Sequence, residues 1–419
     1  MKDAGSRPFL VAGLLSCLVA AGCGSGNGKA AESSAAQTSV SFSGPSVKVG
    51  AITSLTGPIA YPDRVSAARA AVAGINSRGG LAGHEVELDT CDDHGNADGA
   101  AACARQMVSD GVIALVGQNS VSDNASTPIL EAAGIPQIAT ATRTPVSLNS
   151  KLTYEPGPSN QQGYAFLAAY GAKKLGGDVA LVAFDVPQTS GFRDVVTTAL
   201  RPGKVTFSNT VLVPTSQADY APVVASANRE HPHSILFGLP LASLTQFIKT
   251  DASTGSKTTY LSPIQYAPSD AAALGGTAQL DRVVTFTSYP PTLRDTTNPV
   301  LKRYITELKA QEKTGDSDAA LDKQTLGIQP WFGFYVLEEV VKQTKLDDIS
   351  SAGLITALDS AKDIDLGDLV PTWTPTAPGI TGFSRISNTS YFLVGYKNGK
   401  PYQITPEAVS LEAALKGKF

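Results

Sequence analysis

The sequence is poor in the residues and patterns that carry catalytic chemistry. It has four histidines and four cysteines in 419 residues, and neither a Gly-x-Ser-x-Gly nor a His-Glu-x-x-His pattern occurs. His231 and His233 flank Pro232, which favours a turn over a catalytic base. We therefore expect no catalytic residue, no cofactor and no bound metal. An enzyme stays an alternative, because a fold never excludes an activity.

Charge of one sign and long apolar runs are lacking as well. The net charge at pH 7 is −4, and the 33 lysines and arginines form no cluster, so the electrostatic footprint of a nucleic-acid-binding protein is absent. After residue 22 no apolar run approaches the roughly 20 residues that a membrane-spanning helix needs. The 42% hydrophobic and 17% charged residues are typical of a globular protein, and the length allows two domains.

Glycines gather near the N-terminus, in GCGSGNG at positions 22–28. They form no phosphate-binding loop, because the Gly-x-Gly-x-x-Gly template would need glycine at Asn27 or Lys29. Upstream, two positive charges precede an uncharged apolar stretch at 9–21, which is typical of a secretory signal. The small residues before Cys23 resemble the lipobox of bacterial lipoproteins. This resemblance implies that a signal peptide, 1–22, is removed and that Cys23 carries a lipid; plain secretion is the alternative.

Residues 23–46 are predicted to be a flexible tether. The stretch consists of Gly, Ser, Ala and polar residues with Phe42 as its one aromatic. Such a composition buries too little apolar surface to offset the entropy of ordering the chain.

Two cysteines, Cys91 and Cys103, remain in the part that follows the tether. In an exported chain such a pair favours a disulfide, because the compartment is oxidising. Asp92, Asp93 and His94 beside Cys91 offer a metal site as an alternative, but zinc sites usually contain a second close ligand pair, which the sequence lacks. Free thiols are the third alternative.

From residue 47 the chain alternates short apolar strands with amphipathic helices. Strands are predicted at 47–52, 84–89, 112–117 and 136–139, and helices around 65–75, 97–109 and 125–133. The helix at 97–109 is expected to bury Ala101, Ala104 and Val108. After a Pro and Gly break at 155–158, strands are predicted at 178–184, 205–213, 234–239, 258–262 and 281–288, with helices near 161–175, 190–200, 219–230, 242–252 and 268–275. This order predicts an α/β fold with two doubly wound, Rossmann-like lobes.

The last third of the sequence has a different pattern. Helices are predicted near 298–313, 329–345 and 350–361, and Trp331 is expected to pack in the core because it recurs at helical spacing with Phe334 and Tyr335. A hairpin follows at 391–404, whose Asn398-Gly399 suits a type I′ turn. Because the hairpin comes after so many helices, we expect it to complete an earlier sheet.

Four segments carry a resemblance to a known family: VKVGAITSLTGPIA (47–60), AAVAGINSRGGLAGHEVEL (70–88), CDDHGNADGAAACARQMVSDGVIALVGQNS (91–120) and PILEAAGIPQI (128–138). Together they resemble the branched-chain amino acid binding proteins of ABC importers, which have the type I periplasmic binding protein fold. The resemblance implies two lobes joined by a three-crossing hinge, with a ligand closed between them and not altered chemically. It places 47–156 and 290–372 in the N-terminal lobe, and 157–289 and 373–419 in the C-terminal lobe.

The resemblance also implies roles for individual residues. Ser120 and the pair Ala141 and Thr142 match positions that hold an amino acid carboxylate, and Tyr61 falls near an aromatic residue that lines the pocket. Where the family has an acid that pairs with the ligand's ammonium, this chain has Gln265, with no acid between Lys257 and Ser269. An unpaired buried ammonium is costly, so an amino acid ligand is not assured. Ser120 as a helix N-cap and Tyr61 as a partly exposed turn residue are the alternatives.

Other candidate ligand residues follow from the order of the elements. In open α/β sheets ligands bind beyond the carboxyl ends of the strands. The loops 54–58, 118–120 and 140–142 follow strands of the N-terminal lobe and include Asn119; the loops 188–190, 239–240 and 263–266 follow strands of the C-terminal lobe and include Ser190 and Leu239.

These observations predict an extracytoplasmic, lipid-anchored solute-binding protein. It would capture a small polar molecule, an amino acid or a related compound, and deliver it to the permease and ATPase subunits of an ABC importer. We expect a monomer that binds no nucleic acid. A ligand-sensing module that signals through a separate membrane protein is the main alternative.

Overall fold

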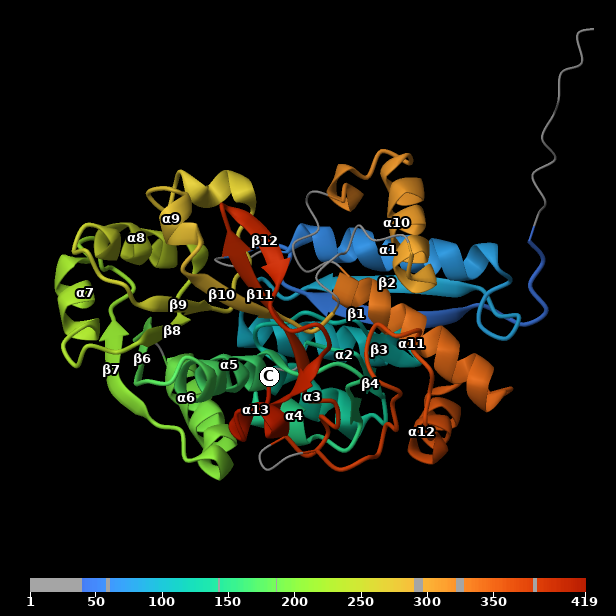
Figure 1. The fold of residues 1–419 in the computed structure, drawn as a ribbon. Helices are drawn as coiled ribbons and strands as arrows, with labels where there is room; N and C mark the ends of the chain where they lie inside the picture. The colour runs from blue at the N-terminus through green and yellow to red at the C-terminus, as the bar shows by residue number, and fades with distance from the viewer. Residues whose placement is uncertain are drawn as a thin grey trace, which may run out of the picture. The chain divides into compact units, whose positions relative to one another are not determined.

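The first parallel sheet is built from the N-terminal part of the chain (Figure 1). The structure, a computed structural model, describes residues 40–57, 61–141, 144–185, 187–289, 297–321, 328–379 and 383–419. The strand order is β2-β1-β3-β4-β5, and every pair is parallel. The strands are β1 (Val47–Thr53), β2 (Val86–Asp92), β3 (Ala114–Val116), β4 (Gln137–Ile138) and β5 (Thr153–Tyr154).

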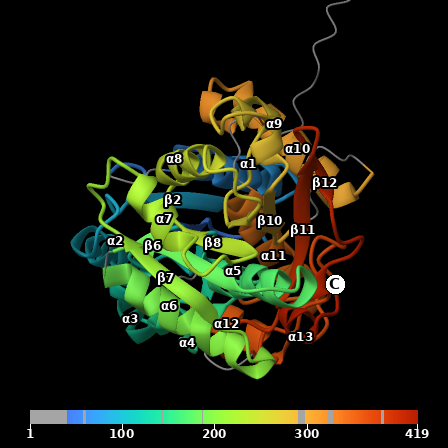
Figure 2. The same ribbon diagram turned by 60° about the vertical axis from the view of Figure 1, so that its left-hand side comes forward.

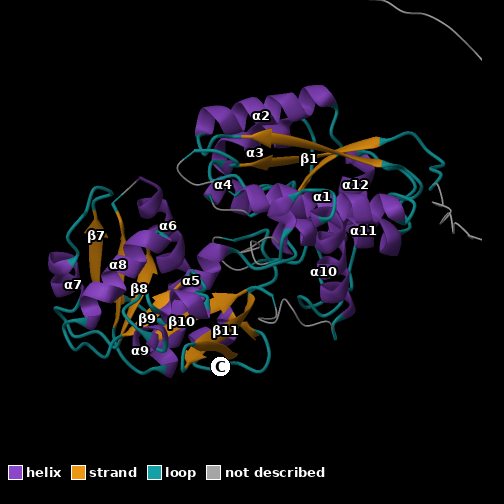
Figure 3. Cartoon of the chain, turned by 90° about the horizontal axis from the view of Figure 1, so that it is seen from above, coloured by secondary structure: helices purple, strands orange, loops and turns teal. Residues whose placement is uncertain are grey.

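Helices cover both faces of this sheet (Figure 3). On one face, Ile52 and Leu115 pack against residues of α2 and α3. On the other face, Val49 and Val116 pack against α1, α10, α11 and α12, so helices from the last third of the chain complete this core. The helices are α1 (Pro62–Ser77), α2 (Ala97–Asp110), α3 (Asp123–Ala132), α10 (Pro299–Glu312), α11 (Ile328–Thr344) and α12 (Ser351–Ser360). The short α4 (Pro145–Asn149) follows, and its Leu148 packs in the core of the second sheet.

The second sheet has the strand order β12-β11-β10-β9-β8-β6-β7, with β13 paired to β11. Its strands from β7 to β10 are parallel, whereas β11 and β12 run antiparallel to their neighbours. The strands are β6 (Val179–Phe184), β7 (Phe207–Val213), β8 (Ser234–Gly238), β9 (Thr259–Ser262), β10 (Val283–Thr287), β11 (Ser390–Lys397), β12 (Lys400–Gln403) and β13 (Val409–Ser410).

Strand β6 shows why this sheet is also covered on both faces. Val179, Leu181 and Ala183 pack in one core cluster, whereas the alternate residues Ala180 and Val182 pack in another. The helices that supply these cores are α5 (Asn160–Ala169), α6 (Pro187–Leu200), α7 (Ala221–Ala227), α8 (Leu241–Ala252), α9 (Thr277–Leu280) and α13 (Leu411–Leu415).

The C-terminal hairpin completes the second sheet, as the sequence predicts (Figure 2). Strand β11 lies antiparallel to β10, and β12 pairs with β11. Asn398 and Gly399 both have positive φ angles, 53° and 71°, as a type I′ turn requires. Their N–H groups donate to the carboxylate of Asp281, at 2.9 and 2.8 Å, which fixes the turn to the end of α9.

The predicted fold class, two doubly wound α/β units, is confirmed, and Trp331 is fully buried in the core. The predicted face of α2 is wrong in part. The helix buries Ala100, Cys103, Ala104 and Met107, whereas Val108 is 39% exposed. The reason is that Cys103 turns toward the sheet, where it packs with Ile52 and Leu115.

The chain passes between the two cores around 155–159, 288–298 and 374–389, and 290–296 and 380–382 of these passages lie outside the described residues. The first and last passages lie side by side. Glu155 forms a parallel bridge with Ile386, and the Asn388 side chain donates to the Pro156 carbonyl at 3.1 Å. The exact lobe boundaries given above stay predictions. No helix in the described ranges is long and apolar enough to cross a membrane.

Candidate functional site

Three loops meet at the carboxyl end of the first sheet. Thr53 forms a bridge with Asn119, the Ser54 N–H donates to the Asn119 carbonyl at 3.4 Å, and the Ala141 N–H donates to the Gln118 carbonyl at 2.9 Å. The loops after β1, β3 and β4 are therefore neighbours, as expected for parallel strands. We call residues 54–56, 118–120 and 139–141 the first carboxyl end.

Ser120 is buried, and its hydroxyl is engaged within the protein. It donates to the carboxylate of Asp93 and accepts the Ser122 N–H at 3.0 Å. The N-cap of α3 is Ser122, so the alternative that Ser120 caps this helix is wrong. The oxygen is fixed in place by Asp93, and a contact of Ser120 with a ligand carboxylate stays a prediction.

The loop after β4 is tied to the first hinge passage. The Thr140 hydroxyl donates to Oε1 of Glu155 at 2.8 Å, and both side chains are buried. Burial raises the pKa of the Glu155 carboxyl well above its usual range; the bonds from Thr140 lower it, and the nearby Asp123 raises it further. Ala141 lies in this loop, and Thr142 lies outside the described residues.

A polar network at the same place was not predicted from the sequence. Gln329, on the first turn of α11, donates to the Ala139 carbonyl at 2.7 Å. Its Oε1 atom accepts from Arg64 at 3.2 Å and from the Asn119 amide at 3.3 Å. Gln329 thus holds two of the three loops and the first turn of α1 together, from a helix more than 180 residues further along the chain.

Tyr61 lies beside this network. Its N–H donates to the Ser54 carbonyl at 2.8 Å, and the Arg64 guanidinium lies 4.6 Å from the centre of its ring. Arg64 itself is 2% exposed. A cationic side chain of α1 therefore lies beside the first carboxyl end. The sequence alone did not indicate this role, because Arg64 is a single arginine within a helical pattern.

Of the three candidate ligand residues that follow strands of the second sheet, Leu239 and Gln265 differ in how far their side chains are exposed. Leu239 is buried in the core, and Gln265 is exposed in the loop after β9. The backbone of Ser190 lies in the first turns of α6, which begins at Pro187 and not near 190; its side chain is outside the described set. Asp185, which follows β6 directly, is an exposed carboxylate that sequence reasoning missed.

At the end of β2, Cys91 and Cys103 are joined in a disulfide, with Cα atoms 5.6 Å apart. The pairing removes both thiolates from the alternative metal site, and the described residues contain no cluster suited to a metal ion. Beside it, burial raises the pKa of Asp92, but hydrogen bonds from the Thr56 hydroxyl and from the N–H groups of His94, Leu55 and Thr56 outweigh burial and lower the pKa to about 2.

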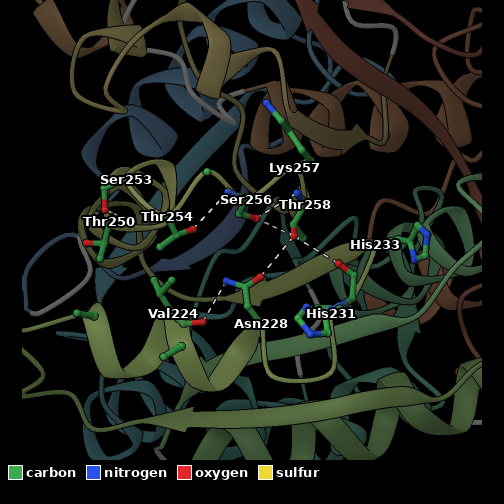
Figure 4. Close-up of a pocket in the computed structure, with 14 residues that line it drawn as sticks. Val224, Asn228, His231, His233, Thr250, Ser253, Thr254, Ser256, Lys257 and Thr258 are labelled. Carbon is green, nitrogen blue, oxygen red and sulfur yellow. Dashed lines mark hydrogen bonds between the residues drawn. The ribbon is translucent and has the colours of Figure 1, made fainter.

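A cavity of about 600 Å³ lies elsewhere, at the amino ends of β8 and β9 (Figure 4). We call it the amino-end cavity. Its lining comes from α7, the C-terminal part of α8 and the segments before the two strands. Five hydroxyls in it each donate to an oxygen of the protein itself: Thr250, Ser253, Thr254, Ser256 and Thr258. Despite its volume, this cavity leaves none of these five donors for a ligand.

A buried carboxylate, Asp251, is hydrogen-bonded to the lining of the amino-end cavity. Asp251 is fully buried and accepts from the Asn228 amide at 2.7 Å, the Tyr260 hydroxyl at 2.7 Å and Arg282 at 3.2 Å. Burial and then the hydrogen bond to Asp251 raise the pKa of Tyr260. The Arg282 guanidinium also lies 4.2 Å from the centre of the Tyr260 ring. These groups satisfy one another, which is typical of a structural network.

Residues 46–388 match the family model described as "Periplasmic binding protein". The chain belongs to this family. Its fold is the type I periplasmic binding protein fold, and the family is extracytoplasmic. A Leu/Ile/Val-binding protein of Escherichia coli is 25% identical over 225 residues, which cover 52% of this chain and 61% of the relative.

Several solved structures share the fold over most of the chain. A leucine-binding protein from Thermotoga maritima is 18% identical with a TM-score of 0.66, covering 87% of this chain and 99% of its own. A fatty acid ABC transporter substrate-binding protein from Thermomonospora curvata is 18% identical with a TM-score of 0.67, covering 90% and 96%. At these identities the likeness shows the fold alone.

Proposed function

We propose that this periplasmic binding protein is the solute-binding lipoprotein of an ABC importer. The observation that carries the proposal is the first carboxyl end, where three loops of a family member gather buried polar side chains and a cationic group beyond the ends of parallel strands. This is where open α/β sheets bind ligands. The solute would bridge the two lobes and stabilise their closed arrangement, which the permease recognises.

The solute is proposed to be a small organic acid with an apolar body. The relatives are named for leucine, isoleucine and valine or for a fatty acid, and these share a carboxylate. The Arg64 guanidinium beside the first carboxyl end would supply positive potential for it. The exposed Asp185, after β6, is a candidate partner for an ammonium group.

The ligand proposal is tested by thermal unfolding of the purified protein with L-leucine, L-valine and octanoate. A ligand that binds the folded state raises the melting temperature, because it adds to the free energy of unfolding. At a ligand concentration a hundredfold above Kd the added free energy is about 2.7 kcal/mol. Asp185→Asn should weaken binding of the amino acids and leave octanoate binding unchanged. Absence of any shift with all three compounds would contradict the proposed ligand class.

Anchoring is tested separately through Cys23. We expect Cys23→Ala to move the protein from the membrane fraction to the soluble extracytoplasmic fraction, because the lipid is proposed to be attached to that sulfur. Cys17→Ala, which changes the other N-terminal cysteine, is the matched control and should remain with the membrane. A Cys23→Ala protein that stays membrane-bound would rule out this anchor.

A further inference from the structure

Two buried side-chain oxygen atoms at the first carboxyl end have no hydrogen-bond partner among the described residues. The Ser54 hydroxyl follows β1 and the Gln118 side-chain oxygen follows β3; the residues are 0% and 2% exposed. They come from adjacent strands, because Ser54 donates its N–H to the Asn119 carbonyl. Ser54 also accepts the Tyr61 N–H at its carbonyl, so its backbone is fixed while its hydroxyl is not.

The contrast with neighbouring residues is what makes these two atoms informative. Ser120 is bonded to Asp93, Thr140 to Glu155, and Asn119 to Gln329. Buried polar atoms in folded proteins are nearly always hydrogen-bonded, because an unmet bond in a low-dielectric interior costs stability. Two unmet groups at the place where a ligand is expected are accounted for if the ligand supplies the missing bonds.

We propose that Ser54 and Gln118 are ligand-contacting residues that accept hydrogen bonds from an ammonium or hydroxyl group of the solute. The inference rests on the proposed function, since it deepens the description of the same site. An amide oxygen can only accept, which sets the polarity of the ligand group opposite it. Ser54 and Gln118 would thus accept hydrogen bonds at the first sheet. At the second sheet, the position where the family has an acid holds Gln265, which has no carboxylate.

A rival explanation is that a buried water molecule satisfies both groups and no ligand contacts them. Such a water needs two to four polar partners and is costly to remove. The two explanations predict opposite results when the polar atoms are replaced by apolar ones. Replacing a group that is unmet removes a cost and stabilises the free protein, whereas replacing a group that is satisfied destabilises it.

The test uses Ser54→Ala and Gln118→Met in the full chain, with Ser234→Ala as the matched control. The Ser234 hydroxyl is equally buried and also lacks a partner, but it lies at the start of β8, at the amino end of the second sheet. We expect all three variants to melt about 1–3 °C higher than wild type without ligand. Only Ser54→Ala and Gln118→Met should raise the Kd for L-leucine, about tenfold each.

The chemical group is identified by two analogues of leucine. Isocaproate lacks the amino group, and leucic acid carries a hydroxyl in its place. Wild type should bind leucine and leucic acid more tightly than isocaproate, and Ser54→Ala and Gln118→Met should remove that preference while Ser234→Ala keeps it. Lower melting temperatures for Ser54→Ala and Gln118→Met, or unchanged Kd values, would overturn the inference.

Failure of the proposed function gives a different result. If leucine, leucic acid and isocaproate all leave the wild-type melt unmoved, the proposed ligand class fails. Native mass spectrometry of the proteins as purified then decides the inference. Less co-purified solute on Ser54→Ala and Gln118→Met than on Ser234→Ala supports it, and equal amounts overturn it.

Discussion

The amino-end cavity and the first carboxyl end differ in their hydrogen bonding, and the comparison shows that a large cavity need not be the site that recognises a ligand. The cavity measures about 600 Å³, yet the hydroxyls of its lining donate to the protein and Asp251 beneath it has three donors. The first carboxyl end contributes no residue to the lining of this cavity, but it holds the unmet side-chain oxygens of Ser54 and Gln118. A large hollow is the usual first choice for a ligand site, and here unmet hydrogen bonds point elsewhere.

The largest expected effect tests whether the amino-end cavity is structural. Asp251→Ala should lower the free energy of unfolding by about 3–5 kcal/mol, because it leaves Arg282 and Tyr260 without their buried partner. Chemical denaturation measures the loss. The ligand-induced shift in melting temperature should persist at a temperature where the variant is folded.

An exposed aspartate provides the control for that experiment. Asp347→Ala changes a side chain in the loop after α11 and should alter stability by no more than about 0.5 kcal/mol. Equal stabilities for Asp251→Ala and Asp347→Ala would show that the network beneath the cavity contributes nothing.

The next effect tests whether the first carboxyl end is preorganised. Gln329→Leu removes the acceptor of Arg64 and Asn119 and the donor to Ala139, so we expect a loss of about 2–3 kcal/mol in unfolding free energy together with weaker solute binding. Denaturation and ligand titration measure the two losses. Gln343→Leu, on the exposed side of the same helix, should leave binding unchanged. A Gln329→Leu protein with wild-type affinity would show that the loops need no such support.

A third effect concerns pH and the hinge. Because the folded-state pKa of Glu155 is raised, its ionisation favours the unfolded chain, and wild type should lose stability as pH rises above the unfolded value of about 4.3. Glu155→Gln keeps an oxygen that can accept the Thr140 hydrogen bond, and it replaces the carboxyl by an amide that does not ionise. It should match wild type near pH 4 and exceed it by about 1–2 kcal/mol at pH 7, as followed by melts across this range. A less stable variant at pH 7 would mean that the buried carboxylate is ionised and paired.

The smallest expected effect is at the rim of the amino-end cavity. Lys257 is exposed there, and Lys257→Ala should change stability by less than about 0.5 kcal/mol and leave ligand titrations unchanged. If the variant altered solute binding, the cavity would be a recognition site and the contrast between the two regions would be reversed.

Local patterning predicted the regular elements well and the short ones poorly. Helices α1, α10 and α11 and the hairpin at Asn398-Gly399 follow from periodicity and turn chemistry. The segment 268–275 was expected to be a helix, but it has one 3₁₀ turn at Pro268–Ala271. The five-residue α4 and the two-residue β5 gave no signal, because such elements depend on tertiary contacts more than on propensity.

The meeting of the three loops at the first carboxyl end was predictable from the sequence, but the hydrogen bonds of their side chains were not. The order of strands and helices located the loops that contain Asn119, Ser120 and Ala141, because carboxyl ends of parallel strands share one end of a sheet. That Ser120 donates to Asp93, or that Gln329 holds Asn119, depends on side chains from distant segments. No periodicity in one segment encodes such pairings.

The interleaving of the chain has a consequence for the timing of folding. The first core includes helices up to α12 and Trp373, and the second sheet receives β11 and β12 from the last 30 residues. Neither half of the molecule is a contiguous stretch, so neither core is complete until synthesis is nearly finished. Both cores therefore depend on contacts between segments far apart in the sequence, which slows folding and delays stable packing until the C-terminal strands are available.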